Sequence, residues 1–280
     1  MYTLSSLNKI SKLIQRHPFH LVDFSPWPFT ASISVFSCVI GSVMYMHGYQ
    51  KSNFVLLSSF CMLLVTMFVW WRDVTRESVF EGHHTSMVQK GLRLGVILFI
   101  VSEILFFFGF FWAFFYNSCE PALSVGAMWP PVGITTVDTW KVPFLNTLIL
   151  LSSGFTVTWA HHAIVSNNRT QAMLGLFLTI FYAILFTSTQ ALEYYSTAFR
   201  LSDGIYGAVF YMTTGFHGFH VIIGTIFLGV CFYRLINYHF TWQHHFGLEA
   251  AIWYWHFVDV VWLFLFVAVY WWGDYPQNLN

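Results

Sequence analysis

The residues most able to do chemistry in this sequence are carboxylates and histidines placed inside long apolar stretches. Glu103 lies in the middle of the run ILFIVSEILFFFGFF, and His217 and His220 lie in TTGFHGFHVIIG. A spacing of three residues places both imidazoles on one face of a helix. A carboxylate in apolar surroundings is hard to ionise, and a histidine beside it could exchange its proton. Proton handling is therefore one chemistry that these residues could support.

A third apolar stretch carries Glu249, His256 and Asp259, which the helical repeat places on one face. Three helices would then carry polar groups to a similar depth. The structural alternative is that these groups hydrogen-bond one another and lock the helices together, at about 0.6–2 kcal/mol for each pair. The sequence favours this structural role, because a complete proton relay needs more titratable groups than the outer halves of these stretches offer.

Metal and haem binding are further alternatives. The chain has three histidine doublets, His83-His84, His161-His162 and His244-His245. They lack the H-x-x-x-H and H-x-x-H-H spacing of di-iron desaturases, and adjacent helical residues point about 100° apart. Haem ligation by His217, His220 or His256 is open in principle, but nearby glycines are better explained by close helix packing. Four separated cysteines form no C-x-x-C motif. We therefore predict no metal site and no cofactor in this chain.

The elements that must position these residues are transmembrane helices. Of 280 residues 57% are apolar and 9% are charged, with a mean hydropathy of +0.61. Such a composition is typical of an integral membrane protein. The formal net charge is zero, which argues against nucleic-acid binding, and 21% aromatic residues exclude intrinsic disorder.

Seven stretches are long enough to cross a hydrocarbon core of roughly 30 Å. The sequence predicts an all-α fold with spans at 29–48, 53–71, 92–116, 144–165, 172–195, 205–233 and 248–272. The connection 117–143 contains Pro-Pro and several glycines, which indicates a surface loop.

The distribution of Lys and Arg predicts the orientation. With the N-terminus inside, the inside segments hold Lys9, Lys12, Arg16, Arg72, Arg76, Lys90, Arg93, Arg169 and Arg234. The outside segments hold Lys51, Lys141 and Arg200. Nine against three is a strong positive-inside signal. The N-terminus is expected in the matrix or cytoplasm, and the first sixteen residues also have the composition of a mitochondrial presequence.

The inside segment 72–91 is unusually rich in charge. Its titratable residues cluster beside Trp70 and Trp71 and include Arg72, Asp73, Arg76, Glu77, Glu81, His83 and His84. An interfacial arginine can present a bidentate fork to a phosphate, and a carboxylate can accept an ethanolamine ammonium group. Besides its role as a topology signal, this segment is a candidate lipid headgroup site.

Taken together, the motifs resemble one family. Eight segments of the chain look like cytochrome c oxidase subunit III. They are HPFHLVDFSPWP at 17–28, WWRDVTRES at 70–78, EGHHT at 81–85, SEILFFFGFFWAF at 102–114, WPP at 129–131, TWAHHAI at 158–164, TGFHGFHVIIGT at 214–225 and EAAIWYWHFVDVVWLFLF at 249–266. They occur in the order of that family and cover about 17–273. The two spans ahead of the last five resemble its seven-helix form.

The resemblance implies a non-catalytic subunit without haem or copper, bound beside catalytic subunit I, which carries haem a and copper, and beside the other subunits of respiratory complex IV. It implies a two-helix and a five-helix bundle separated by a V-shaped cleft filled with phospholipids. Arg76, Glu77 and His84 match lipid-contacting positions, Arg234 matches another, and Glu103 matches the buried carboxylate of the family. The implied function is to stabilise the oxidase, support its proton uptake and guide oxygen.

The predicted organisation is an inside segment at 1–28, the helix pair at 29–71, an inside loop at 72–91, the five-helix bundle at 92–273 and a tail at 274–280. The implied location is the mitochondrial inner membrane, with the N-terminus in the matrix and the C-terminus in the intermembrane space. Two other functions stay open. A di-iron membrane oxygenase would need iron bound to this chain, and a proton channel or transporter would show flux without a partner, although no internal repeat supports transport.

Overall fold

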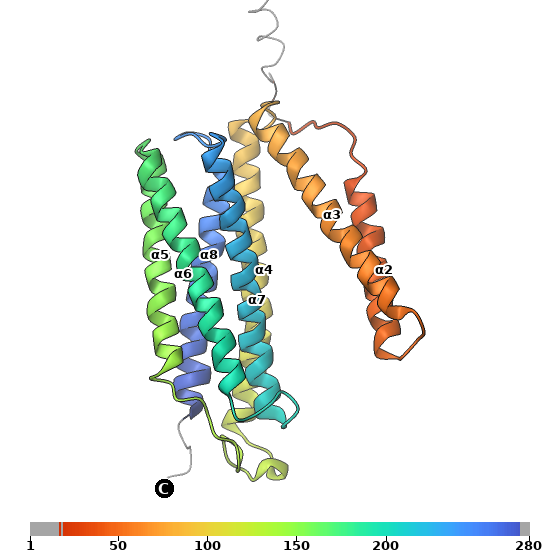
Figure 1. The fold of residues 1–280 in the computed structure, drawn as a ribbon, viewed down its shortest axis with the longest axis vertical. Helices are drawn as coiled ribbons and strands as arrows, with labels where there is room; N and C mark the ends of the chain where they lie inside the picture. Colours follow the sequence, from red (N-terminus) through yellow and green to blue (C-terminus); the bar gives the residue numbers. More distant parts are fainter. Residues whose placement is uncertain (1–16, 18, 275–280) are drawn as a thin grey trace, which may run out of the picture. The chain divides into compact units, whose positions relative to one another are not determined.

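The computed structural model describes residue 17 and residues 19–274, and over these residues the regular structure is helical (Figure 1). Seven of the described helices are long and apolar enough to cross a membrane, which confirms the predicted all-α fold with seven spans. The basic extension 1–16 and the end of the tail, 275–280, lie outside the described residues. The chain divides into two compact units, Met1–Leu92 and Arg93–Asn280. The V-shaped cleft that the resemblance implies stays a prediction.

The first unit is built on α2, Trp27–Met46, and α3, Ser52–Val79, which run side by side (Figure 1). They meet closely at Gly41, where an added Cβ would lie 3.0 Å from the Leu56 Cα atom. Ser34, Ser59 and Thr66 are buried, and each hydroxyl donates to a carbonyl four residues earlier in its own helix. Because these hydroxyls are already hydrogen-bonded, they can lie in an apolar contact at little cost.

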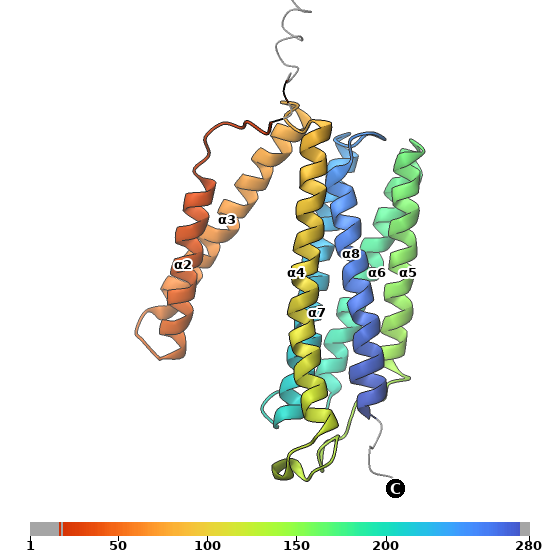
Figure 2. The same cartoon turned by 180° about the vertical axis from the view of Figure 1, so that it is seen from behind.

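The second unit contains α5, Val142–Val165, α6, Arg169–Ser196, α7, Ile205–Ile236, and α8, Phe246–Leu265, which continues as a π-helical segment η2, Phe266–Trp272 (Figure 2). Helix α8 is the most buried of these, and its Trp255 and Trp262 indoles are fully enclosed. Trp255 Nε1 donates to Ser153 Oγ at 2.9 Å, and Trp262 Nε1 donates to Thr147 Oγ1 at 2.9 Å. These bonds fix α8 against α5.

Most of α4, Ser86–Cys119, also belongs to the second unit and packs through aromatic rings. Phe106 contacts Phe216 of α7 at 5.1 Å between ring centroids, and Phe107 contacts Phe257 of α8 at 6.0 Å. Edge-to-face and tilted ring pairs of this kind add about 0.5–1.5 kcal/mol to the burial of the rings. Aromatic side chains therefore form the contacts of α4 with α7 and α8.

The helices near the charged segment are longer than the predicted spans. Helix α3 continues to Val79 and α4 begins at Ser86, so only residues 80–85 connect them. The expectation of a loop over 72–91 was therefore wrong for most of its length. The reason is that hydropathy detects only the part of a helix that needs hydrocarbon, whereas Arg, Glu, Gln and Lys are good helix formers in water. The long connection before α5 holds one short 3₁₀ turn, Leu123–Val125.

Candidate functional site

Glu103 of α4 lies against His220 of α7. Its Oε2 atom is 2.7 Å from His220 Nε2, and the two side chains are 22% and 9% exposed. The other imidazole nitrogen, Nδ1, lies 2.6 Å from the Phe216 carbonyl oxygen. The rings of Phe107 and Tyr254 surround this imidazole, with centroids 5.0 and 6.4 Å away. The structure thus brings together a carboxylate and a histidine that are 117 residues apart.

The other histidines expected at membrane depth hydrogen-bond to groups of neighbouring helices. His217 Nε2 lies 3.1 Å from the Val258 carbonyl oxygen, and His256 Nε2 lies 3.2 Å from Thr158 Oγ1. Both nitrogens of His220 are engaged, which disfavours haem ligation by this imidazole. His217 Nδ1 is buried and has no hydrogen-bond partner among the described residues. Asp259 packs against α5 at Gly154, where an added Cβ would lie 2.8 Å from Oδ2. Its Oδ1 atom has no hydrogen-bond partner among the described residues.

Glu249, which the sequence analysis grouped with His256 and Asp259, lies apart from them at the start of α8. It lies in the first turn of α8, where its Oε2 atom accepts a hydrogen bond from Arg93 Nε at 2.8 Å. Its Oε1 atom lies 3.4 Å from His245 Nε2. The His161 ring approaches the same histidine with centroids 5.6 Å apart. One histidine from each of two doublets and a carboxylate therefore meet at this end of the bundle.

Arg234 lies in the last turn of α7 with its guanidinium carbon 4.5 Å from the Phe240 ring centroid. An added Cβ at Gly247 would lie 2.6 Å from its Nη1 atom, so the end of this side chain lies directly against Gly247. Arg234 makes no ion pair with any described residue, and its Nε atom is buried without a hydrogen-bond partner. Burial, and then the positive charge of Arg234, lower the pKa of His239 nearby. The guanidinium thus keeps an uncompensated positive charge.

The charged end of α3 contains two arginines, of which one is bound by a carboxylate and the other is not. Asp73 binds Arg72 through Nε and Nη2, at 2.9 and 2.8 Å, and also accepts a hydrogen bond from Trp27 Nε1 at 2.7 Å. Arg76, one turn further along, is exposed and makes no hydrogen bond through its side chain to any residue in the described part of the chain. Only the second guanidinium can offer its full set of donors to a ligand.

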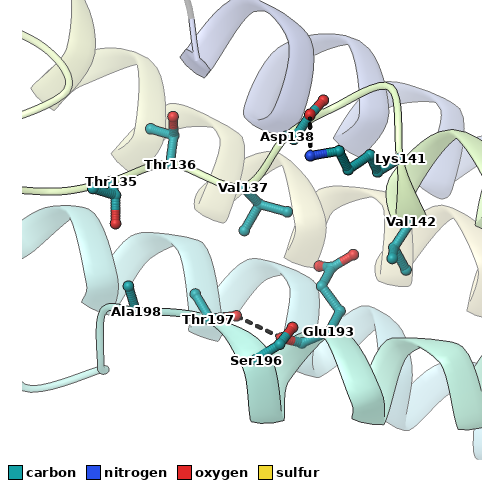
Figure 3. A pocket seen from close by; sticks show the side chains of 10 residues that line it. All are labelled: Thr135, Thr136, Val137, Asp138, Lys141, Val142, Glu193, Ser196, Thr197 and Ala198. Atoms are coloured by element: carbon teal, nitrogen blue, oxygen red, sulfur yellow. Dashed lines mark hydrogen bonds and ion pairs between the residues drawn. The ribbon is translucent and has the colours of Figure 1, made fainter.

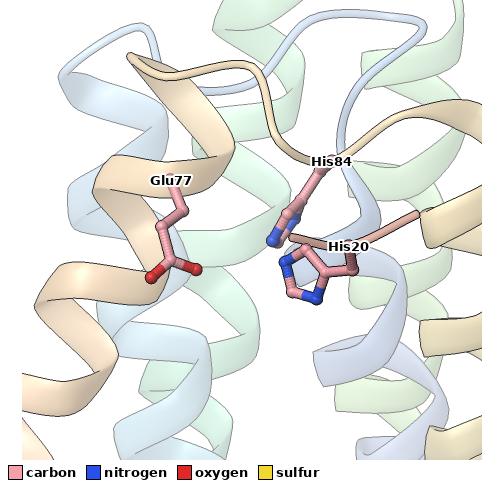
Figure 4. A group of neighbouring side chains, drawn as sticks. All are labelled: His20, Glu77 and His84. Carbon is pink, nitrogen blue, oxygen red and sulfur yellow. The ribbon is translucent and has the colours of Figure 1, made fainter. Parts of the chain in front are cut away.

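Glu77 lies beside Arg76 and belongs to another group of possible metal ligands. This group consists of His20, Glu77 and His84. Each residue offers one ligand atom, and the three atoms lie within 4.8 Å of one another. Figure 4 shows Glu77 on α3, His84 on the connection that follows it, and His20 on the N-terminal segment. The sequence singled out Glu77 and His84, but not their approach to His20.

A buried carboxylate that the sequence did not single out is Glu193, near the end of α6. It is 2% exposed, and its Oε1 atom accepts hydrogen bonds from Tyr270 Oη at 2.7 Å and Gln190 Nε2 at 3.0 Å. The Oε2 atom has no hydrogen-bond partner among the described residues. The signal that could have found it is a glutamate only a few residues inside the predicted span 172–195.

Glu193 lines a cavity of about 320 Å³ between the connection 135–142 and the end of α6 (Figure 3). Across this cavity, Lys141 Nζ lies 3.0 Å from Asp138 Oδ2. The hydrogen bond from Lys141, together with one from the Trp140 backbone N–H, lowers the pKa of Asp138. The cavity is therefore bounded by a buried carboxylate on one side and an exposed ion pair on the other.

Comparisons with known proteins agree with the motifs. A family described as "Cytochrome c oxidase subunit III" matches residues 17–274. "Cytochrome c oxidase subunit 3" of Chondrus crispus is 66% identical over 270 residues, covering 96% of this chain and 99% of the relative. The proteins of the same name from Marchantia polymorpha and Pylaiella littoralis are 60% and 58% identical over 259 and 267 residues, covering 92% and 95% of this chain and 98% of each relative. The chain belongs to the cytochrome c oxidase subunit III family.

Proposed function

We propose that the chain is a core subunit of cytochrome c oxidase that carries no redox centre of its own. It binds phospholipids, stabilises catalytic subunit I, and supports proton uptake and oxygen access there, while haem a and copper belong to partner subunits. Family membership supports this proposal. A second support is that the imidazoles at membrane depth hydrogen-bond to Glu103, Thr158 and backbone carbonyls.

The metal content of the isolated chain tests this part of the proposal. We expect the chain, separated from an oxidase that contains haem and copper, to be colourless and to hold neither haem nor stoichiometric iron or copper. Stoichiometric iron on the isolated chain would instead favour a di-iron oxygenase. Proton or substrate flux through the chain alone in liposomes would favour a channel or transporter.

We further propose that Arg76, Glu77 and His84 contact a phospholipid headgroup and that Arg234 contacts a second. The observation that carries this proposal is the contrast between the two arginines of α3, because Arg72 is held by Asp73 whereas the Arg76 fork is available to a phosphate. Apolar side chains cover much of the α2 and α3 surface, with Phe29 69% and Phe68 73% exposed. This surface suits acyl chains.

An Arg76→Ala variant tests the headgroup contact. Charge-assisted hydrogen bonds are worth about 1.5–3 kcal/mol each, so we expect phospholipid to be retained about tenfold more weakly. The measurement is the phospholipid that stays with the purified oxidase during washing with detergent. The matched control is Arg72→Ala, whose guanidinium is already bound by Asp73, and its phospholipid content should be close to that of the wild type. Equal retention in all three proteins would refute the lipid role of Arg76.

We also propose that the chain lies in the mitochondrial inner membrane with its N-terminus in the matrix and its C-terminus in the intermembrane space. The excess of Lys and Arg in the inside segments supports this orientation. Of those residues, Lys9, Lys12 and Arg16 lie outside the described part of the chain. The remaining inside charges still outnumber the outside ones by six to three.

A further inference from the structure

Three side chains with metal-binding atoms meet at the charged end of α3, although they come from three different segments. The His20 and His84 rings are nearly perpendicular, with centroids 5.4 Å apart. Glu77 completes the group, and the ligand atoms of all three residues lie within 4.8 Å of one another (Figure 4). We refer to these three residues as the His20 group.

The end of α3 brings His84 back to Glu77. The Phe80 and Glu81 backbone N–H groups donate to the Arg76 carbonyl oxygen, at 2.9 and 3.2 Å. Gly82 then adopts a φ of 71°, a left-handed conformation that costs glycine little. The His83 N–H donates to the Glu77 carbonyl oxygen at 3.0 Å. The connection therefore folds over the last turn of α3, and His84 follows directly.

The N-terminal segment brings His20 to the same turn. Trp27 Nε1 donates to Asp73 Oδ2 at 2.7 Å and so attaches this segment to α3. Asp73 and Glu77 are four residues apart and share one face of the helix. The attachment point therefore lies one turn from Glu77, and His20, seven residues before Trp27, reaches its carboxylate.

We propose that the His20 group binds a divalent transition-metal ion, with zinc as the best fit. Two imidazole nitrogens and one carboxylate oxygen, with a fourth position open to water, form a ligand set that zinc uses in proteins. The ligands are nitrogen and oxygen atoms without a thiolate, which suits Zn²⁺ better than Cu⁺. Glu77 supplies the carboxylate ligand of the group, and Glu81 lies close enough to interact electrostatically with it.

The zinc proposal does not depend on the proposed lipid contact. Glu77 and His84 belong to both proposed sites, whereas Arg76 is not one of the metal ligands and His20 is not one of the proposed lipid residues. The open position on the zinc ion could nevertheless accept a phosphate oxygen beside Arg76. Loss of zinc in a His20 variant and loss of lipid in an Arg76 variant can therefore be measured separately.

The second group of possible ligands, His161, His245 and Glu249, is a weaker candidate. Arg93 already neutralises Glu249 through a hydrogen bond of 2.8 Å. The His245 Nδ1 atom is 3.0 Å from the Thr241 carbonyl oxygen, and its Nε2 atom faces Glu249. A zinc ion there would have to compete with a formed ion pair. Any test must still distinguish the two groups.

The first test measures zinc bound to the purified oxidase holoenzyme by equilibrium dialysis against Zn²⁺ and elemental analysis. Outer-shell changes alone weaken metal sites about 10–100-fold, so we expect His20→Ala and His84→Ala each to weaken one zinc site by about 100-fold or more. The matched control is His83→Ala, because the His83 Nε2 atom faces Glu81 Oε2 at 3.5 Å instead of the His20 group. This control should keep the zinc affinity of the wild type. Unchanged zinc binding in the His20 and His84 variants would overturn the proposal.

The second test uses the wild-type oxidase and so does not depend on the folding of any variant. Histidines are modified with diethylpyrocarbonate in the presence and absence of Zn²⁺ and identified by peptide mass spectrometry. We expect zinc to protect His20 and His84 and to leave the exposed His47 reactive. Protection of His161 and His245 alone would assign the zinc ion to the other group and refute the proposal.

Discussion

The contact between Glu103 and His220 holds one proton at a defined place. A carbonyl oxygen can only accept, so His220 Nδ1 must carry a hydrogen toward the Phe216 carbonyl oxygen. A single further proton then lies between His220 Nε2 and Glu103 Oε2. The pair is either neutral histidine with protonated glutamate or imidazolium with carboxylate. An infrared band of a protonated carboxyl group distinguishes the first of these forms from the second.

We expect Glu103→Gln to preserve the structure and to remove one infrared band of a protonated carboxyl group. The glutamine amide can donate to His220 Nε2 as the protonated carboxyl does. Glu103→Ala leaves this buried nitrogen without a partner and should destabilise the oxidase by about 1–3 kcal/mol. Difference infrared spectra and thermal unfolding of the two variants test both expectations. An unchanged carboxyl region in the glutamine variant would contradict the protonated form.

Helix α7 approaches α8 closely at Gly224. An added Cβ at Gly224 would lie 2.9 Å from the Trp255 ring, whereas no atom of another described residue lies within 4 Å of such a Cβ at Gly215, Gly218 or Gly229. Close helix packing, which the sequence analysis expected for the glycines near His217 and His220, therefore occurs at Gly224 and is not seen among the described residues at Gly215 or Gly218. Because Trp255 is fully buried and hydrogen-bonded to Ser153, its ring cannot move aside easily.

A Gly224→Ala variant should consequently be less stable than the wild type. Overpacking a buried contact costs typically about 1–3 kcal/mol. Gly218→Ala on the same helix is the matched control and should be neutral or slightly stabilising, because alanine is the better helix former. The measurement is the thermal unfolding of each variant in the assembled oxidase. Similar destabilisation by both substitutions would show that the Trp255 contact is not the cause.

Hydropathy predicts where the helices of this chain lie but not which of their side chains meet. The seven spans follow from apolar runs of sufficient length, and Glu103 and His220 stand out as polar residues within them. Their pairing could not be derived, because it depends on which faces of α4 and α7 turn toward each other. Glu193 was missed because it lies close to the end of a span. The His20 group was missed because α2 and most of α3 separate His20 from Glu77 and His84 in the sequence.

At the scale of the whole chain, the orientation depends on charges that flank seven helices. Cys119 is exposed at the end of α4, on a connection predicted to lie outside, and Ser166 is exposed between α5 and α6, on a connection predicted to lie inside. The other three cysteines lie within α2, α3 and α7. A water-soluble thiol reagent can therefore report on the topology with little background.

We expect a membrane-impermeant maleimide to label Cys119 in mitoplasts, whose inner membrane is intact. A Ser166→Cys variant should gain a second label only after the inner membrane is permeabilised. The readout is the mass of the labelled peptides, and Cys231, which is buried, provides an unlabelled control within the same chain. Labelling of the introduced cysteine in intact mitoplasts would reverse the proposed orientation.

The π-helical segment Phe266–Trp272 contains one residue more than an α-helix would need at the end of the last span. A hydrogen bond from residue i to residue i+5 accommodates one residue more than an α-helical turn. This added residue turns the end of the last span so that Tyr270 reaches Glu193 across the bundle. Deleting one of the residues 266–269 would restore an α-helix and rotate Tyr270 by about 100° away from its partner. The number of residues in this segment therefore decides which side chain of the last span faces Glu193.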